Sequence, residues 1–135
     1  NTIRTTANIK SYFNKSNGSL VTPGSLDFLF KRKSVFSISK ISNSELEKLE
    51  LDLIDYGLEE VVTNDDELII YGDYKNFSIL NKALINSNNN ILKGELKRIS
   101  NSPIKYDEDQ LKEIECMLDK IDDDDDVQAV FTNIL

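Results

Sequence analysis

The sequence predicts an α+β fold in which two ferredoxin-like sandwiches each place helices on one face of an antiparallel sheet. Segments with apolar residues at helical spacing and segments with apolar residues at strand spacing follow one another along the chain. The middle of the chain is predicted to form a nearly complete α-β-β-α-β unit. The first stretch lacks a helix and a closing strand, which the last stretch can supply. The sequence therefore predicts a discontinuous domain of residues 1–40 and 101–135, with residues 41–100 inserted as a second domain.

The first stretch predicts one helix and two short strands. The helix covers residues 2–15 and ends at Asn17-Gly18, because glycine tolerates the left-handed conformation of a helix C-terminus. A turn at Pro23-Gly24 leads into a strand over residues 25–32, and a second strand covers residues 35–39. The alternating apolar residues of the first strand, expected in the core, are Leu26, Phe28 and Phe30. This domain would still need one strand before Asn1, so we expect a segment upstream.

The middle stretch predicts two helices and three strands. Ser42-Asn43-Ser44 offers an N-cap for a helix that ends at Gly57, and Asp73 caps a second helix that is broken near Asn86. A tight turn at Asn64-Asp65-Asp66 joins the first two strands. The strands are expected over residues 59–63, 67–71 and 91–99.

The last stretch predicts a helix and a strand separated by an acidic run. The helix covers about residues 107–121, the acidic run covers residues 122–126, and the alternating strand covers residues 127–132. Cys116 lies among apolar residues of the helix and is expected to be a core thiol. The apolar seam of the helix is formed by Leu111, Ile114, Leu118 and Ile121.

The composition excludes several classes of active site. The chain has no histidine and one cysteine, which removes the usual general base, the common catalytic triads and a structural zinc site. Its five glycines are scattered singly, so there is no glycine-rich phosphate loop. We therefore expect no catalysis, no metal and no cofactor. The single cysteine and the absence of a signal peptide or long apolar run predict a cytoplasmic protein without a membrane segment.

Charge is segregated along the sequence. Residues 1–40 hold seven Lys or Arg residues against one acid, whereas the remaining stretches are strongly acidic and bring the net charge to −8. The basic stretch is either a phosphate-contacting surface or ordinary solubilising charge. The candidate nucleic-acid-binding residues are Arg4, Lys10, Lys15, Lys31, Arg32, Lys33 and Lys40. Residues 31–33 are the strongest candidates, because three adjacent cations between two strands repel one another.

The acidic run of residues 122–126 allows three interpretations. It is a solvated turn, or it lies beside residues 31–33 and screens them, or it binds a cation. A cation site has the least support, because the run lacks the spaced ligands and the glycine of an EF-hand loop.

Several motifs resemble the YebC-type (YebC/PmpR) family of regulatory proteins over essentially the whole chain. The closing stretch of residues 125–133, Asp-Asp-Val-Gln-Ala-Val-Phe-Thr-Asn, is the most specific, and residues 56–60 are similar to the inserted third domain more loosely. The chain departs from the usual pattern at Ser34 and Leu58. The matching residues of the second domain are Arg4, Thr5, Phe13, Lys15, Gly18, Leu20, Gly24, Ser25, Phe28, Leu29, Phe30, Arg32 and Lys33.

The resemblance implies a non-enzymatic regulator of gene expression whose basic N-terminal helical domain is absent here. Its members are described as DNA-binding transcriptional regulators, and the mitochondrial relative as a translational activator. The implied partner is therefore duplex DNA or ribosomal RNA, reached mainly through the absent domain, with possible ribosome contact. A third hypothesis is an amino-acid sensor of the ACT type, with its ligand at the turn around Gly57.

Overall fold

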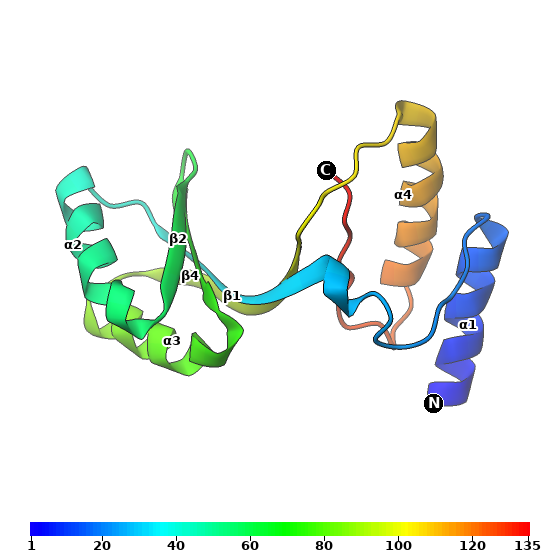
Figure 1. The fold of residues 1–135 in the computed structure, drawn as a ribbon, viewed down its shortest axis with the longest axis horizontal. Helices are drawn as coiled ribbons and strands as arrows, with labels where there is room; N and C mark the ends of the chain where they lie inside the picture. Colours follow the sequence, from blue (N-terminus) through cyan, green and yellow to red (C-terminus); the bar gives the residue numbers. More distant parts are fainter. The chain divides into compact units, whose positions relative to one another are not determined.

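A computed structural model describes residues 1–135 and divides them into two compact units (Figure 1). Unit 1 is Asn1–Lys31 with Ser100–Leu135, and unit 2 is Arg32–Ile99. The helices are α1 (Thr2–Lys15), α2 (Asn43–Leu53), α3 (Phe77–Asn86) and α4 (Glu108–Asp122). The strands are β1 (Phe30–Ser39), β2 (Leu58–Thr63), β3 (Glu67–Asp73) and β4 (Ile91–Ser100), and the 3-10 turns are η1 (Asp27–Leu29), η2 (Ile54–Tyr56) and η3 (Tyr74–Asn76).

Unit 2 has the element order β1-α2-β2-β3-α3-β4 and the strand order β2-β3-β1-β4. This is the complete split βαβ arrangement of a ferredoxin-like fold, so the predicted α+β class is confirmed. The central strand β3 pairs antiparallel with both β1 and β2. Helices α2 and α3 cover one sheet face, because their buried leucines join alternate residues of β1 and β3 in one core. That core consists of Phe36, Ile38, Leu49, Leu53, Leu68, Ile70, Leu80 and Leu84.

The termini of the unit 2 helices follow the predicted signals. The Ser42 side chain accepts a hydrogen bond from the Glu45 backbone N–H, and Gly57 ends the α2–η2 segment in the left-handed conformation at φ 93°. Asp73 caps η3, which leads directly into α3. Strands β2, β3 and β4 lie where the alternating pattern placed them, within two residues at each end.

The predicted division of residues 25–39 into two strands is wrong. Residues 30–39 form the single strand β1, which pairs with β3, so residues 32–39 lie in unit 2 rather than with residues 1–31. Residues 25–29 form a turn and η1, in which Gly24 has φ 84° and its carbonyl accepts from the Asp27 N–H. Phe28 is consequently 75% exposed instead of lying in the core.

Unit 1 is built around α1 and α4 and holds no regular sheet. Residues 127–132 alternate but do not form a strand, because no other segment pairs with them. The only bridge nearby is an isolated parallel one between Ile104 and Ile134. A strand needs a hydrogen-bonded partner as well as the right alternation. Within this unit, Asn101 donates its backbone N–H to the Leu29 carbonyl at 2.9 Å and its side-chain amide to the Phe28 carbonyl at 3.0 Å.

Helix α4 begins at the predicted position with a complete capping box. Asp107 accepts from the Gln110 N–H, and the Gln110 side chain accepts from the Asp107 N–H. Cys116 is exposed, so its assignment to the core is wrong. It lies two residues after Ile114, about 200° around the helix from that inward-facing position. None of the helices combines the length and the apolar composition that a membrane span requires.

Candidate nucleic-acid interface

The seven predicted cations are divided between the two units. Arg4, Lys10 and Lys15 lie on α1, and Lys31 ends the first segment of unit 1. The other three, Arg32, Lys33 and Lys40, belong to unit 2. The cations of each unit are therefore described separately.

In unit 2, Arg32 is one member of a cation–aromatic cluster. Its guanidinium carbon lies 4.2 Å from the centroid of the Tyr74 ring, and the Lys75 ammonium lies 6.0 Å from the same centroid. Arg32 and Lys75 are exposed, and the Tyr74 ring is half-buried between strand and solvent. Two exposed cations are thus held at one aromatic ring, which we call the Arg32 cluster (Arg32, Tyr74 and Lys75).

The local fold explains why these residues meet. In the β1–β3 ladder Lys33 pairs with Asp73, so Arg32 reaches the turn that follows β3. The buried Ser34 hydroxyl donates to the Asp73 carbonyl at 2.8 Å, which fixes β1 to this turn. The Asp73 side chain in turn accepts from the Lys75 N–H at 2.9 Å. Tyr74 and Lys75 are therefore positioned by the same cap that begins η3.

The cluster has the chemistry of a phosphate-binding site. A guanidinium stacked on an aromatic ring loses side-chain freedom but keeps its N–H groups available for bidentate contact with a phosphate. Lys75 adds a second positive charge beside it. The sequence predicted Arg32 but not Tyr74 or Lys75, and the only available signal was the Asp73 cap that places them at a strand end.

The other unit 2 candidates are engaged with acidic residues or backbone. The Lys33 ammonium lies 3.1 Å from a Glu59 carboxylate oxygen, and Lys40 donates to the Asp65 carbonyl at 3.3 Å. Arg32 and Lys33 are neighbours on a strand and project to opposite faces. Residues 31–33 lie within the single strand β1 rather than between two strands, as the sequence suggested.

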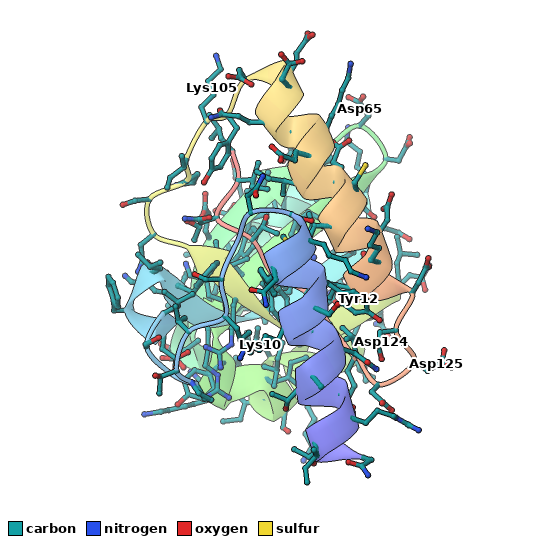
Figure 2. All side chains as sticks on the ribbon, turned by 90° about the vertical axis from the view of Figure 1, so that its right-hand side faces the viewer. Lys10, Tyr12, Asp65, Lys105, Asp124 and Asp125 are labelled. Carbon is teal, nitrogen blue, oxygen red and sulfur yellow. The ribbon has the colours of Figure 1, made fainter.

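The acidic run contacts α1 within unit 1. The Tyr12 hydroxyl donates to Asp124 at 3.1 Å, and Figure 2 shows these two side chains side by side where α1 passes the end of α4. Asp126 accepts from the Thr5 hydroxyl at 2.7 Å and lies 3.7 Å from the Arg4 guanidinium. Asp124 and Asp126 thus find their side-chain partners on α1, and the screening of residues 31–33 by the run stays a prediction. Arg4 is partly neutralised, whereas Lys10 and Lys15 form no ion pair.

We expect Asp126 to stabilise the packing of α1 in a pH-dependent way. The hydrogen bond from Thr5, the largest cause, holds the pKa of Asp126 below its ordinary value of 3.8, and the positive charge of Arg4 contributes less. A lowered folded-state pKa contributes stability above the unfolded-state value, and this contribution disappears as the pH falls through the folded-state pKa. Asp126→Asn should therefore lower the melting temperature slightly at pH 7 and should have no effect near pH 2. Exposed Asp125→Asn is the matched control, and equal losses from both substitutions at pH 7 would contradict the assignment.

At the turn around Gly57, the place suggested for an amino-acid ligand, the Asn76 side chain lies against the backbone. A Cβ at Gly57 would collide with the Asn76 side-chain amide, so Asn76 occupies the space beside this backbone. No group of three or more Cys, Asp or Glu side chains has the arrangement to hold a metal ion.

Known proteins match this chain over nearly its full length. Residues 1–134 match the family model described as the TACO1/YebC second and third domain. A Helicobacter hepaticus protein named a probable transcriptional regulatory protein is 52% identical over 139 residues, covering 99% of this chain and 58% of that protein. A Campylobacter jejuni protein of the same name is 49% identical over 134 residues, covering 99% and 57%.

A solved structure also matches. The crystal structure of a conserved hypothetical protein from Aquifex aeolicus superposes with a TM-score of 0.81 at 26% identity, covering 100% of this chain and 56% of that one. The chain thus spans just over half the length of the relatives it matches. From the family match and the identities together, the chain belongs to the TACO1/YebC family and corresponds to its second and third domains.

Proposed function

We propose that this chain is part of a non-enzymatic transcriptional regulatory protein that binds duplex DNA in its complete form. The observation that carries the proposal is the identity of about half of its residues to proteins named probable transcriptional regulatory proteins. The geometry adds a contact of the right chemistry, because the Arg32 cluster offers a stacked guanidinium and an ammonium to a phosphate.

The contribution of this chain to DNA binding should be small. The chain carries a net charge of −8, and affinity for the phosphate backbone depends on the number of phosphates that cations neutralise. We therefore place most of the affinity outside this chain and assign the Arg32 cluster a role in positioning. The alternative is a translation factor that contacts ribosomal RNA, since the same cluster would serve either nucleic acid.

The test is a matched competition between the two nucleic-acid partners. This chain and the full-length Campylobacter jejuni relative are each offered promoter-length duplex DNA and purified ribosomes at near-physiological salt. Sequence-dependent retention on DNA supports the transcriptional regulator. Retention on ribosomes, with DNA binding abolished by modest salt, overturns it in favour of the translation factor.

Substitution of the cluster tests the assigned contact. We expect the double variant Arg32→Ala/Lys75→Ala to bind duplex DNA more weakly and to reduce the slope of log affinity against log salt by about 2. Lys48→Ala/Lys82→Ala removes two exposed cations from α2 and α3 and serves as the control. An unchanged affinity and slope in the cluster variant would remove these residues from the interface.

A further inference from the structure

The strand β4 forms a free edge of the unit 2 sheet. In the strand order β2-β3-β1-β4, β1 and β3 have a neighbour on both sides, whereas β2 and β4 have a neighbour on one side only. An edge strand presents backbone N–H and C=O groups that lack a strand partner. The first half of β4 is largely exposed, and its residues 98–100 are half-buried. We call residues 91–97 the β4 edge.

The two free edges of the sheet differ in how open they are to another strand. β2 is six residues long, carries Glu59 next to Glu60, and shifts its register with β3 between Leu58 and Glu60. Adjacent carboxylates and an irregular register are features that protect an edge from pairing. β4 is ten residues long, contains no proline, and leaves Leu92 54% and Leu96 49% exposed. The β4 edge is therefore the edge that is open to a partner strand.

One face of the β4 edge is charged. It is the sheet face away from the helices, and its charged residues are Lys93, Glu95 and Lys97. The Glu95 carboxylate lies 3.4 Å from the Lys93 ammonium and 3.2 Å from the Lys97 ammonium. These ion pairs join residues two apart, as expected for side chains on one face of a strand. The Lys93 side chain is 68% exposed, so it can reach a carboxylate on another chain.

The opposite face of the β4 edge is apolar. A Cβ at Gly94 would stand 2.9 Å from the Phe36 ring, so Gly94 faces the helix-covered core. Leu92 and Leu96 lie two residues to either side of Gly94 and share its face. Both leucines are nevertheless about half exposed, because β4 is the outermost strand. A strand added beside β4 would cover them.

The β4 edge is complementary to a second copy of itself. Its middle reads Leu-Lys-Gly-Glu-Leu. When two such strands run antiparallel with Gly94 opposite Gly94, Leu92 stands opposite Leu96 of the second copy, and Lys93 stands opposite its Glu95. Side chains directly opposite in an antiparallel pair have Cβ atoms about 4.5–5.5 Å apart, so leucine meets leucine and ammonium meets carboxylate. Two-fold symmetry makes each of these contacts occur twice.

The sequence selects this register over its neighbours. A centre at Glu95 would place the two Glu95 carboxylates opposite each other, and a centre at Lys93 would do the same for two ammonium groups. Like charges directly opposite one another destabilise a strand pair. A centre at Leu96 would move the contact into the half-buried residues 98–100. The register centred on Gly94 is the one that matches both leucines and charges within the exposed segment.

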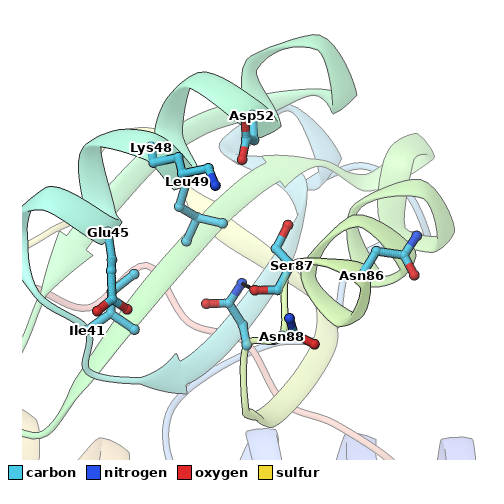
Figure 3. A pocket seen from close by; sticks show the side chains of 9 residues that line it. Ile41, Glu45, Lys48, Leu49, Asp52, Asn86, Ser87 and Asn88 are labelled. Carbon is cyan, nitrogen blue, oxygen red and sulfur yellow. Dashed lines mark hydrogen bonds between the residues drawn. The ribbon is translucent and has the colours of Figure 1, made fainter.

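The helical face of unit 2 offers no comparable selection of a partner. A cavity of about 410 Å³ lies between α2 and the end of α3, and Figure 3 shows Glu45, Lys48 and Asp52 around it. Charges of both signs thus border this cavity, and the leucine that lines it, Leu49, is 4% exposed. The β4 edge, in contrast, has residues that specify their own counterpart.

We propose that two copies of this chain pair through antiparallel β4 edges centred on Gly94. The pairing joins four strands from each copy into one continuous sheet, with the helices of both copies on the same face. A contact of about seven residues a side is smaller than most stable interfaces, so we expect a reversible dimer with a dissociation constant on the order of 100 µM. It uses no residue of the Arg32 cluster, and it adds a contact between copies to the proposed nucleic-acid contact.

Sedimentation equilibrium of the 135-residue chain measures the dimer, and amide chemical shifts locate it. Between about 10 µM and about 1 mM we expect a monomer–dimer equilibrium. The shifts that change with concentration should lie in residues 91–97. Absence of a dimer at the highest concentration, or changes on β2 or on the helices instead, would overturn the proposal.

Charge reversal at the two facing positions tests the register. Lys93→Glu and Glu95→Lys each place like charges opposite one another in a dimer of identical copies, so each should weaken dimerisation about tenfold. An equimolar mixture of the two variants restores opposite charges at both contacts. The mixture should therefore dimerise about as strongly as the unaltered chain.

A matched substitution separates the edge contact from the general effect of net charge. Lys82→Glu on the exposed surface of α3 changes the net charge as Lys93→Glu does, and it should alter the dissociation constant by about twofold at most. Circular dichroism checks that every variant folds. Equal losses for the two lysine variants, or a mixture that associates no better than either charge variant alone, would overturn the pairing centred on Gly94.

Discussion

Phe36→Ala is expected to lower the free energy of unfolding by about 3–5 kcal/mol, because truncating a buried phenylalanine loses its transfer free energy and leaves a cavity. Phe36 is fully buried on β1, and its ring stacks on Phe77 with centroids 4.8 Å apart and an interplanar angle of 25°. The ring also lies against Gly94, where an added Cβ would stand 2.9 Å from it. The cavity would therefore open between sheet and α3, where little can move to fill it.

Urea unfolding followed by circular dichroism measures this loss. Phe28→Ala is the matched control, because Phe28 is 75% exposed and its truncation should cost less than about 1 kcal/mol. A typical domain is stable by only about 5–15 kcal/mol, so the Phe36 variant should be close to unfolding at 37 °C. Similar losses for the two phenylalanines would contradict the placement of β1 in the core of unit 2.

Gly72→Ala is the second large effect that we expect, with a loss of about 1–3 kcal/mol from overpacking. A Cβ at Gly72 would stand 2.9 Å from the Gly57 carbonyl oxygen and still closer to the Leu80 side chain. Leu80 can change rotamer, but the Gly57 carbonyl belongs to the backbone and has no such freedom. The clash therefore has to be relieved by separating η2 from β3.

Thermal unfolding of Gly72→Ala is best compared with Gly18→Ala. Both substitutions reduce the entropy of the unfolded chain by a similar amount. At Gly18 the nearest atom to the new Cβ is a flexible one, the Phe13 ring at 3.2 Å, and the effect should stay within about 1 kcal/mol. A stabilised Gly72 variant would show that the η2–β3 contact is looser than described.

The sequence predicted most of unit 2 because its signals are local. Ser42, Gly57 and Asp73 end or begin elements through hydrogen bonds and φ angles of their own segments. The exception was β1, since charged residues 31–33 interrupt the apolar alternation and suggested a break between two strands. Pairing with β3 over seven residues overrides that local preference, and this pairing joins positions 28 to 40 residues apart.

Unit 1 and the candidate site depend more on distant contacts and were predicted less well. Residues 127–132 alternate correctly, yet alternation alone cannot provide a neighbouring strand. Arg32 became a candidate because its charge is visible in the sequence. Its partners Tyr74 and Lys75 were not found, because only the β1–β3 register brings them near it. The division into domains 1–40 with 101–135 and 41–100 stays a prediction, and the compact units differ from it chiefly in residues 32–40.

The hydrogen bonds of Asn101 to Leu29 and Phe28 have a consequence for how this chain can change in evolution. They bring together the residues just before the chain leaves unit 1 and just after it returns. A loop of a few residues could therefore join Leu29 to Asn101 while α1 and α4 keep their positions. Chain ends that lie this close together tolerate the insertion or loss of a whole domain between them. Unit 2 is therefore arranged as an inserted domain, and its surface residues can change in evolution without altering the packing of unit 1.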